Sequence, residues 1–151
     1  MTVAHILSAS LIALTFANVA PGETPYIVAA LLAAGILDLD SVFDAIRVRT
    51  AFRPPVDHAI GPLHGLLGLL GAGVLSVPLF LADEVLARVV FIAFTTHLVQ
   101  DWVTGNSVPL APLDGTELRY FVWTARQRVL VHVAIGTLFG ALWILYLAAV
   151  L

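Results

Sequence analysis

The sequence contains no cysteine and no lysine. Without cysteine the chain cannot form disulfides or use a thiolate, so any bound metal must be held by imidazole nitrogen and carboxylate oxygen. Seven arginines face ten acidic residues, and the formal net charge is −3. This balance leaves no basic field for a nucleic acid, and we expect no nucleic-acid partner.

Three common catalytic motifs are also missing, namely GxSxG, GxxxxGK[ST] and HExxH. Charge is scarce as well: 11% of the residues are charged, 60% are hydrophobic, and the mean hydropathy is +1.00. A soluble domain carries about 25% charged residues. The composition therefore predicts that the lipid bilayer is the main partner of the chain.

Hydrophobic runs predict an all-α, polytopic membrane protein, a bundle of about five transmembrane helices in a single domain covering residues 1–151. A helix needs about 20 residues to cross the hydrocarbon core. The expected helices cover residues 3–20, 25–43, 60–81, 85–102 and 129–151. The second is the shortest apolar run, since Tyr26–Leu37 reaches spanning length only by continuing past Asp38 and Asp40.

Loop charge predicts the orientation. Alternate crossings place the short links at 21–25 and 82–84 on one side, and the long connections at 41–59 and 103–128 on the side of the N-terminus. Six of the seven arginines lie in or beside the long connections. The positive-inside rule then predicts a multi-pass protein of the inner (cytoplasmic) membrane, with the N-terminus in the cytoplasm and the C-terminus outside. The sequence does not indicate an oligomeric state.

The same threading gathers ionisable residues at the cytoplasmic side. Each lies where an expected helix begins or ends: His5, Asp38, Asp40, His64, His97, Asp101 and His132. Small residues continue each polar position along one helix face, which predicts that these side chains point into the bundle. Ionisable groups at membrane depth are rare and usually functional. No role follows for His132, for the loop residue His58, or for the arginines.

Two motifs carry most of the expected chemistry. His97 and Asp101 form an HxxxD pair on one helix face, able to bind one metal; the alternative is a hydrogen-bonded structural pair. Asp38-Leu39-Asp40 is a DxD motif. Residues two apart point in different directions on a regular helix, so both acids reach one site only if the helix ends there. The alternative is a pair of acids solvated at an interfacial helix end.

The order of these motifs resembles the YdjM-like family of LexA-binding, inner-membrane metal-dependent hydrolases. The resemblance covers about residues 1–115 and rests on His5, the segment 34–40 ending in the DxD motif, the histidines of 58–64, the segment 96–104 around the HxxxD pair, and Pro109-Leu110-Ala111-Pro112. The chain departs from the family at Leu37, where members commonly have proline, and lacks the arginine and serine of an HRGxTHS-like string. Binding to LexA is not expected, because the chain offers no extensive soluble surface.

Together, residues and resemblance predict a metal-dependent hydrolase acting on an ester or phosphoester, with a lipid-like substrate possible, at the cytoplasmic membrane face. The expected metal ligands are His5, Asp38, Asp40, His64, His97 and Asp101. One or two divalent ions fit, zinc first and manganese or iron as alternatives. Whichever of Asp40 and Asp101 does not bind metal is the expected catalytic base. The alternatives are a proton or metal-ion transporter, and a non-catalytic membrane scaffold with a structural metal.

Overall fold

The computed structural model of the chain describes residues 2–39, 64–104, 109–110, 113–114, 116, 121 and 123–149. All regular structure in these segments is helical, which confirms the all-α prediction. The elements are α1 (Thr2–Phe16), α2 (Thr24–Gly35), the 3₁₀ turn η1 (Ile36–Asp38), α4 (Leu66–Ala82), α5 (Glu84–Thr104) and α6 (Ala125–Ala148). Asp40 and His58 lie outside the described residues.

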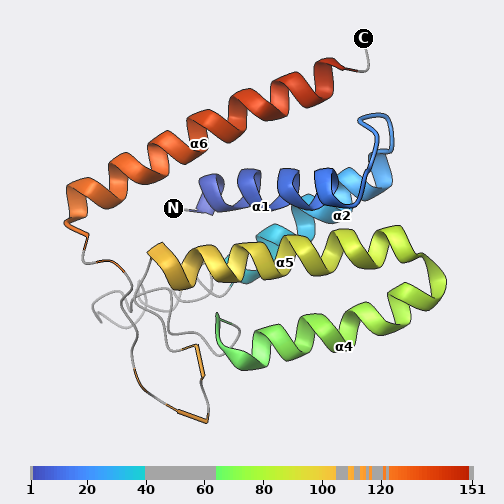
Figure 1. The fold of residues 1–151 in the computed structure, drawn as a ribbon, viewed down its shortest axis with the longest axis horizontal. Helices are drawn as coiled ribbons and strands as arrows, with labels where there is room; N and C mark the ends of the chain where they lie inside the picture. The colour runs from blue at the N-terminus through green and yellow to red at the C-terminus, as the bar shows by residue number, and fades with distance from the viewer. Residues whose placement is uncertain are drawn as a thin grey trace, which may run out of the picture.

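The long helices lie side by side and alternate in direction (Figure 1). Helices α1 and α5 form the centre: α2 packs on both, α4 packs on α5, and α6 packs on α1. Since α1 begins where α2 ends, where α5 ends and where α6 begins, residues far apart in the sequence meet at one end of the bundle (Figure 1).

Helix α1 ends at Phe16, four residues before the predicted boundary. Asn18 adopts a left-handed conformation with φ 54°. The amide of Val19 then donates to the carbonyl of Leu14 at 2.9 Å, and the amide of Asn18 donates to that of Thr15 at 3.2 Å. This is the Schellman arrangement, which satisfies the last carbonyls of a helix and reverses the chain. The helix therefore stops before Pro21.

Helix α6 begins at Ala125, four residues before the predicted start. The hydroxyl of Thr124 accepts a hydrogen bond from the Gln127 amide, and the Gln127 side chain accepts one from the Thr124 amide. This capping box satisfies two helix donors, and its Thr-x-x-Gln pattern is visible in the sequence. The start predicted from hydropathy alone at residue 129 missed it.

Asp83 alone links α4 to α5 at the other end of the bundle. One carboxylate oxygen accepts from the Leu86 amide at 3.0 Å, and the other accepts from the Tyr26 hydroxyl at 2.8 Å. These hydrogen bonds hold the pKa of Asp83 below its ordinary value, with the Leu86 amide as the main cause. The link therefore also fixes the start of α2 against α5.

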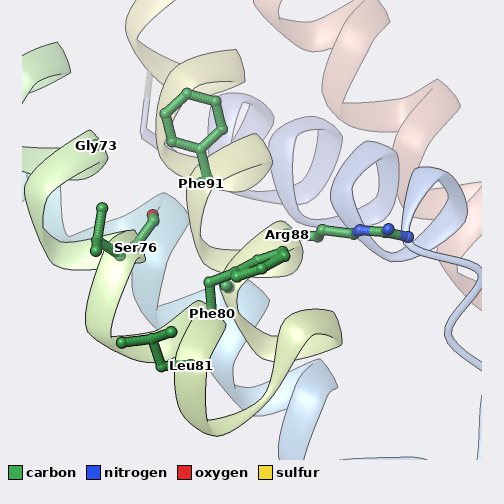
Figure 2. A pocket seen from close by; sticks show the side chains of 8 residues that line it. Gly73, Ser76, Phe80, Leu81, Arg88 and Phe91 are labelled. Atoms are coloured by element: carbon green, nitrogen blue, oxygen red, sulfur yellow. The ribbon is translucent and has the colours of Figure 1, made fainter.

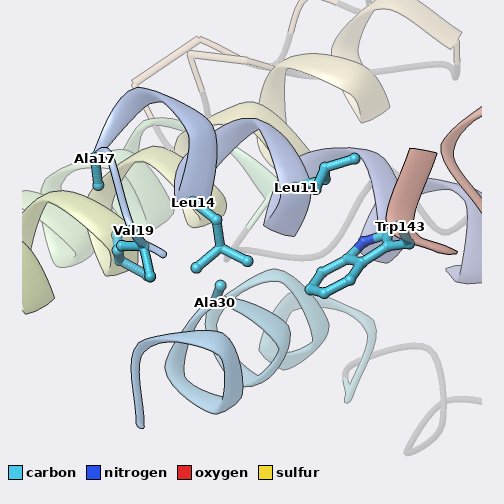
Figure 3. Close-up of a cluster of buried hydrophobic side chains, with 7 residues drawn as sticks. Leu11, Leu14, Ala17, Val19, Ala30 and Trp143 are labelled. Atoms are coloured by element: carbon cyan, nitrogen blue, oxygen red, sulfur yellow. The ribbon is translucent and has the colours of Figure 1, made fainter. Parts of the chain in front are cut away.

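Two apolar clusters form the core. In the first, Leu14 packs between α1 and α2 against Ala30, and Trp143 closes the cluster from α6 (Figure 3). The indole N–H of Trp143 donates to the Leu7 carbonyl at 2.9 Å, so this contact also anchors α6 on α1. The second cluster consists of alanines, namely Ala9, Ala13, Ala33, Ala34 and Ala93. Small side chains let the backbones of α1, α2 and α5 approach closely.

Among the described helices, one is both long and apolar enough to cross a membrane. It covers Arg126–Ala148, in which an 18-residue apolar stretch has a mean hydropathy of 2.0 and only 11% of its residues buried. Three further apolar helices are shorter: Val3–Phe16, Thr24–Asp38 and Leu66–Ala82.

Candidate metal centre

Asp101 lies at the centre of the polar cluster, in the last turn of α5. Its Oδ1 is 2.9 Å from His5 Nδ1, which is a hydrogen bond between α1 and α5. Its Oδ2 is 3.4 Å from His64 Nε2 and 3.4 Å from His97 Nε2. One carboxylate therefore faces three imidazoles from three different parts of the chain.

His97 and Asp101 lie on the same face of α5, as the HxxxD spacing predicts, because His97 precedes Asp101 by one helical turn. His97 is fully buried. Its Nε2 also lies 3.6 Å from Oδ2 of Asp38. Asp38 ends the 3₁₀ turn η1 that follows α2, and η1 packs against α5.

His5 and His64 are held by the starts of their helices. His5 is in the first turn of α1, and His64 directly precedes Gly65, the N-cap of α4. The indole N–H of Trp102 donates to the His64 carbonyl at 2.7 Å and so ties the start of α4 to the end of α5. Both imidazoles are almost completely buried.

Several atoms of the cluster are buried without a hydrogen-bond partner in the described part of the chain. They are His5 Nε2, Asp38 Oδ2, His97 Nε2, Asp101 Oδ2 and His132 Nε2. Buried polar atoms in proteins are almost always paired, and a group of exceptions in one place needs a physical cause. A cation among these lone pairs would supply that cause.

The spacing of the donors supports the same reading. Apart from the 2.9 Å hydrogen bond between His5 and Asp101, the nearest pairs are His64–Asp101, His97–Asp101 and His97–Asp38, which are 3.4, 3.4 and 3.6 Å apart. Hydrogen bonds from nitrogen to oxygen are shorter, about 2.7–3.2 Å. Two ligands about 2.0–2.2 Å from one tetrahedral ion are separated by about 3.3–3.6 Å. The gaps therefore match the edges of a metal coordination shell.

One ion can be shared by three residues at this end of the bundle. Ligand atoms of His5, His97 and Asp101 all lie within 4.8 Å of one another, and the three side chains are buried or half-buried. This nitrogen and oxygen donor set, without sulfur, is chemically suited to a divalent metal. The identity of the metal stays a prediction.

Of the six predicted ligands, the structure brings five into one cluster: His5, Asp38, His64, His97 and Asp101. The sixth, Asp40, lies outside the described residues, so its predicted part in binding and catalysis stays a prediction. A further histidine, His132 of α6, joins the cluster with its ring centroid 5.0 Å from that of His5. The sequence had placed His132 on this side without a role.

Sequence reasoning missed two side chains, Ser8 and Gln100, that connect α1 to α5 beside the cluster. The Gln100 amide donates to the Ser8 hydroxyl at 2.8 Å, and Ser8 donates to the Ala4 carbonyl at 2.7 Å. This bridge joins α1 to α5 next to the hydrogen bond between His5 and Asp101. The signal was present, since Ser8 and Gln100 each lie three residues after a predicted ligand and hence on a neighbouring part of its helix face.

Two of the cavities lined by described residues flank the bundle. One of about 350 Å³ lies between α4 and α5 and is lined by Gly73, Ser76, Val77, Phe80, Leu81, Ala87, Arg88 and Phe91. The Arg88 guanidinium points away from Phe80 and Leu81 (Figure 2) and pairs with Glu84. These residues belong to the half of each helix near the Asp83 link, so this cavity is remote from the metal cluster. The other cavity, between α1 and α6, includes His132.

Comparison with known proteins adds no identity to this geometry. No family model matches the chain, and no curated protein and no solved structure is significantly similar to it. The resemblance to the YdjM-like family therefore stays a prediction, and the case for a function rests on the cluster itself.

Proposed function

We propose that the chain is a multi-pass membrane hydrolase that uses one or two divalent metal ions to cleave an ester or phosphoester at the cytoplasmic face. The observation that carries the proposal is the convergence of buried imidazoles and carboxylates on Asp101, at separations that suit metal ligands.

The apolar surface supports the membrane part of the proposal. Large apolar side chains are exposed along the outer helices, among them Val74, Leu75, Val77 and Leu81 on α4 and Val129, Val133, Ile144 and Leu145 on α6. Soluble monomers rarely expose contiguous apolar patches of this kind. The apolar helix Arg126–Ala148 is mostly unburied, which distinguishes it from the core helix of a soluble protein. The hydrocarbon core of a bilayer removes such apolar surfaces from water.

The orientation follows from where charge lies relative to the cluster. Arg126 and Arg128 stand in the first turn of α6, at the same end as His5 and Asp101. At the opposite end, the described residues beside the Asp83 link include one arginine, Arg88, which pairs with Glu84. The positive-inside rule then assigns the metal cluster to the cytoplasmic side, with the N-terminus in the cytoplasm and the C-terminus outside.

Zinc suits the donor set best, with manganese or iron as alternatives. A divalent ion held here supplies a Lewis acid and lowers the pKa of water in its shell toward about 7. Asp101 faces three imidazoles, and we assign it to holding the ion. His97 and His64 approach the same oxygen of Asp101, and His5, whose Nδ1 orients Asp101 through its other oxygen, joins the donor set through its buried Nε2.

Asp38 is then the described carboxylate available for proton transfer. It contacts one imidazole, that of His97, while its buried Oδ2 has no hydrogen-bond partner within the described segments. In the proposed reaction, water adds to the acyl carbon or phosphorus and gives a proton to Asp38. The ester C–O or P–O bond then breaks, and the leaving oxygen takes that proton. The products are an acid and an alcohol, with no net proton held by the protein.

The proposal is tested by metal content and ester cleavage together. The purified chain in detergent should hold stoichiometric divalent metal and hydrolyse p-nitrophenyl esters or phosphoesters, with both properties lost in His97→Ala. A second variant, Asp38→Asn, separates loss of the base from loss of the metal. It should lower kcat by at least about 100-fold, as expected for loss of a general base, while most of the metal is retained.

Three outcomes count against the proposal. A wild-type chain without stoichiometric metal would exclude a metal centre of any kind. A chain that holds metal and cleaves no ester, but releases metal or protons across liposomes, would indicate a transporter. A His97→Ala chain that loses its helical circular dichroism, in a protein without hydrolytic activity, would indicate a scaffold with a structural metal.

A further inference from the structure

The cavity between α1 and α6 has a volume of about 590 Å³, within the range of ligand sites. Its wall consists of Val3, Ala4 and Leu7 from α1 and of Val129, His132, Val133 and Gly136 from α6. A single side chain in this wall, that of His132, has polar atoms. The cleft is therefore an apolar slot with one polar group.

Gly136 lies where α6 comes close to α1 in the wall of the cleft. A Cβ atom added to Gly136 would lie 3.6 Å from the Cβ of Ala4, so the two helices are in ordinary contact there. The lack of a side chain at Gly136 therefore allows this close approach beside the cleft.

His132 has a defined hydrogen-bonding state. Its Nδ1 lies 2.6 Å from the Arg128 carbonyl, which can only accept, so Nδ1 carries the proton. The neutral ring then presents a lone pair at Nε2. This atom is buried and has no hydrogen-bond partner in the described chain, and the residue as a whole is 8% exposed. The His132 ring therefore lines the cleft, while its Nε2 atom is not open to it.

His132 also joins the cleft to the metal cluster. Its ring centroid is 5.0 Å from that of His5, whose Nδ1 is hydrogen-bonded to Asp101. A molecule in the cleft would therefore place its polar end beside the cluster and its apolar part between α1 and α6.

The outer side of the cleft faces the proposed bilayer. Val3, Val129 and Val133 are 68%, 61% and 60% exposed. They lie on the helices that would meet lipid if α6 spans the membrane. A hydrocarbon chain could then enter sideways, without passing through water.

We propose that the cleft between α1 and α6 binds one hydrocarbon chain of a membrane lipid, with the polar end of that lipid beside His132 and the metal cluster. This inference rests on the proposed hydrolase function and specifies its substrate class as long-chain lipid esters. The chemistry that recognises the substrate is an apolar slot, open toward lipid, with one imidazole in its wall.

The test fills the cleft with a larger side chain. Val133→Trp places an indole in the slot, and because Val133 is already exposed the core should remain intact. Val77→Trp is the matched control, since Val77 is 63% exposed and lines the separate cavity between α4 and α5. The probe is a phosphatidylcholine with a photoreactive diazirine on its acyl chain, in nanodiscs containing the full chain, with labelled positions read by mass spectrometry.

We expect saturable labelling at Val3, Leu7, Val129 or Val133 in the wild type, a loss of at least about five-fold in Val133→Trp, and no change in Val77→Trp. In the parallel assay, wild-type cleavage should favour long-chain esters over short-chain esters. Val133→Trp should lose that preference while its metal content is unchanged.

The outcomes distinguish lipid binding in the cleft from hydrolase activity. Labelling spread evenly over all lipid-facing helices, or equal in both tryptophan variants, would overturn the cleft proposal even if esters are cleaved. Labelling confined to the cleft, in a chain that cleaves no ester, would uphold lipid binding and reject the hydrolase.

Discussion

Replacing Asp101 by asparagine removes the charge at the centre of the cluster with almost no change in shape. The two described carboxylates, Asp38 and Asp101, give the cluster as a whole a charge of −2 with neutral imidazoles, and the substitution leaves −1. It also replaces one oxygen of Asp101 by an amide nitrogen, which has no lone pair for a metal. We therefore expect Asp101→Asn to lose metal.

The size of the loss has a lower limit. Residues that only orient a ligand cost 10- to 100-fold in metal affinity when they are changed. Asp101 is within 3.4 Å of both His64 and His97 and is the better candidate for a direct ligand. The loss should then exceed about 100-fold, or about 2.7 kcal/mol of binding free energy.

The assay is competition for Zn²⁺ against a chromophoric chelator, with elemental analysis of the purified protein. The matched control is Asp83→Asn, the same chemical change at the opposite end of the bundle, which should leave zinc affinity unchanged. Circular dichroism in detergent monitors folding of both variants. Zinc affinity of folded Asp101→Asn within about three-fold of wild type, well short of the orienting-residue range, would refute the assignment of Asp101 to the metal.

Two further predictions concern the ties that hold the bundle together. The depressed pKa of Asp83 means that its hydrogen bonds to Leu86 and Tyr26 favour the ionised form, so their stabilisation is present above the unfolded pKa of about 3.9 and is lost as the pH falls through the lower folded value. Wild type should therefore melt at a higher temperature than Asp83→Asn at pH 7, with the difference shrinking below about pH 4 in thermal melts, and a difference that is constant from pH 7 to pH 3 would contradict it. Trp143→Phe removes the hydrogen bond to the Leu7 carbonyl and should lower the unfolding free energy by about 0.5–1.5 kcal/mol in denaturant titrations, whereas a stability equal to wild type would show that the bond contributes nothing net.

The positions of the helices follow closely from hydropathy, but their ends do not. The apolar run in α1 continues to Ala20, yet the helix stops at Phe16 because Asn18 takes a left-handed conformation and closes a Schellman motif. The end of an apolar run records contact with lipid or core, whereas the end of a helix is decided by local hydrogen bonding. For α6, the Thr124–Gln127 capping pattern marks the boundary in the sequence, but the prediction from hydropathy did not use it.

For the candidate site, too, some properties follow from the sequence and others only from the structure. The sequence alone determined which residue types are available, namely imidazole and carboxylate without sulfur, and the HxxxD spacing of His97 and Asp101 on one helix face. It also indicated, through alternate helix directions, that His5 and Asp38 would lie at the same end of the bundle. These properties depend on composition, helix period and the order of residues, all of which the amino-acid sequence contains.

Only the tertiary structure decided that Asp101 is the residue on which the imidazoles converge, and that His132 lies beside His5 at the wall of a cleft. Distances between side chains on different helices depend on the rotation and offset of each helix. Small-residue contacts such as that between Ala4 and Gly136 set those values, together with single hydrogen bonds between helices. Periodicity gives the face of a helix but not the neighbour that the face meets, because that choice is made by packing.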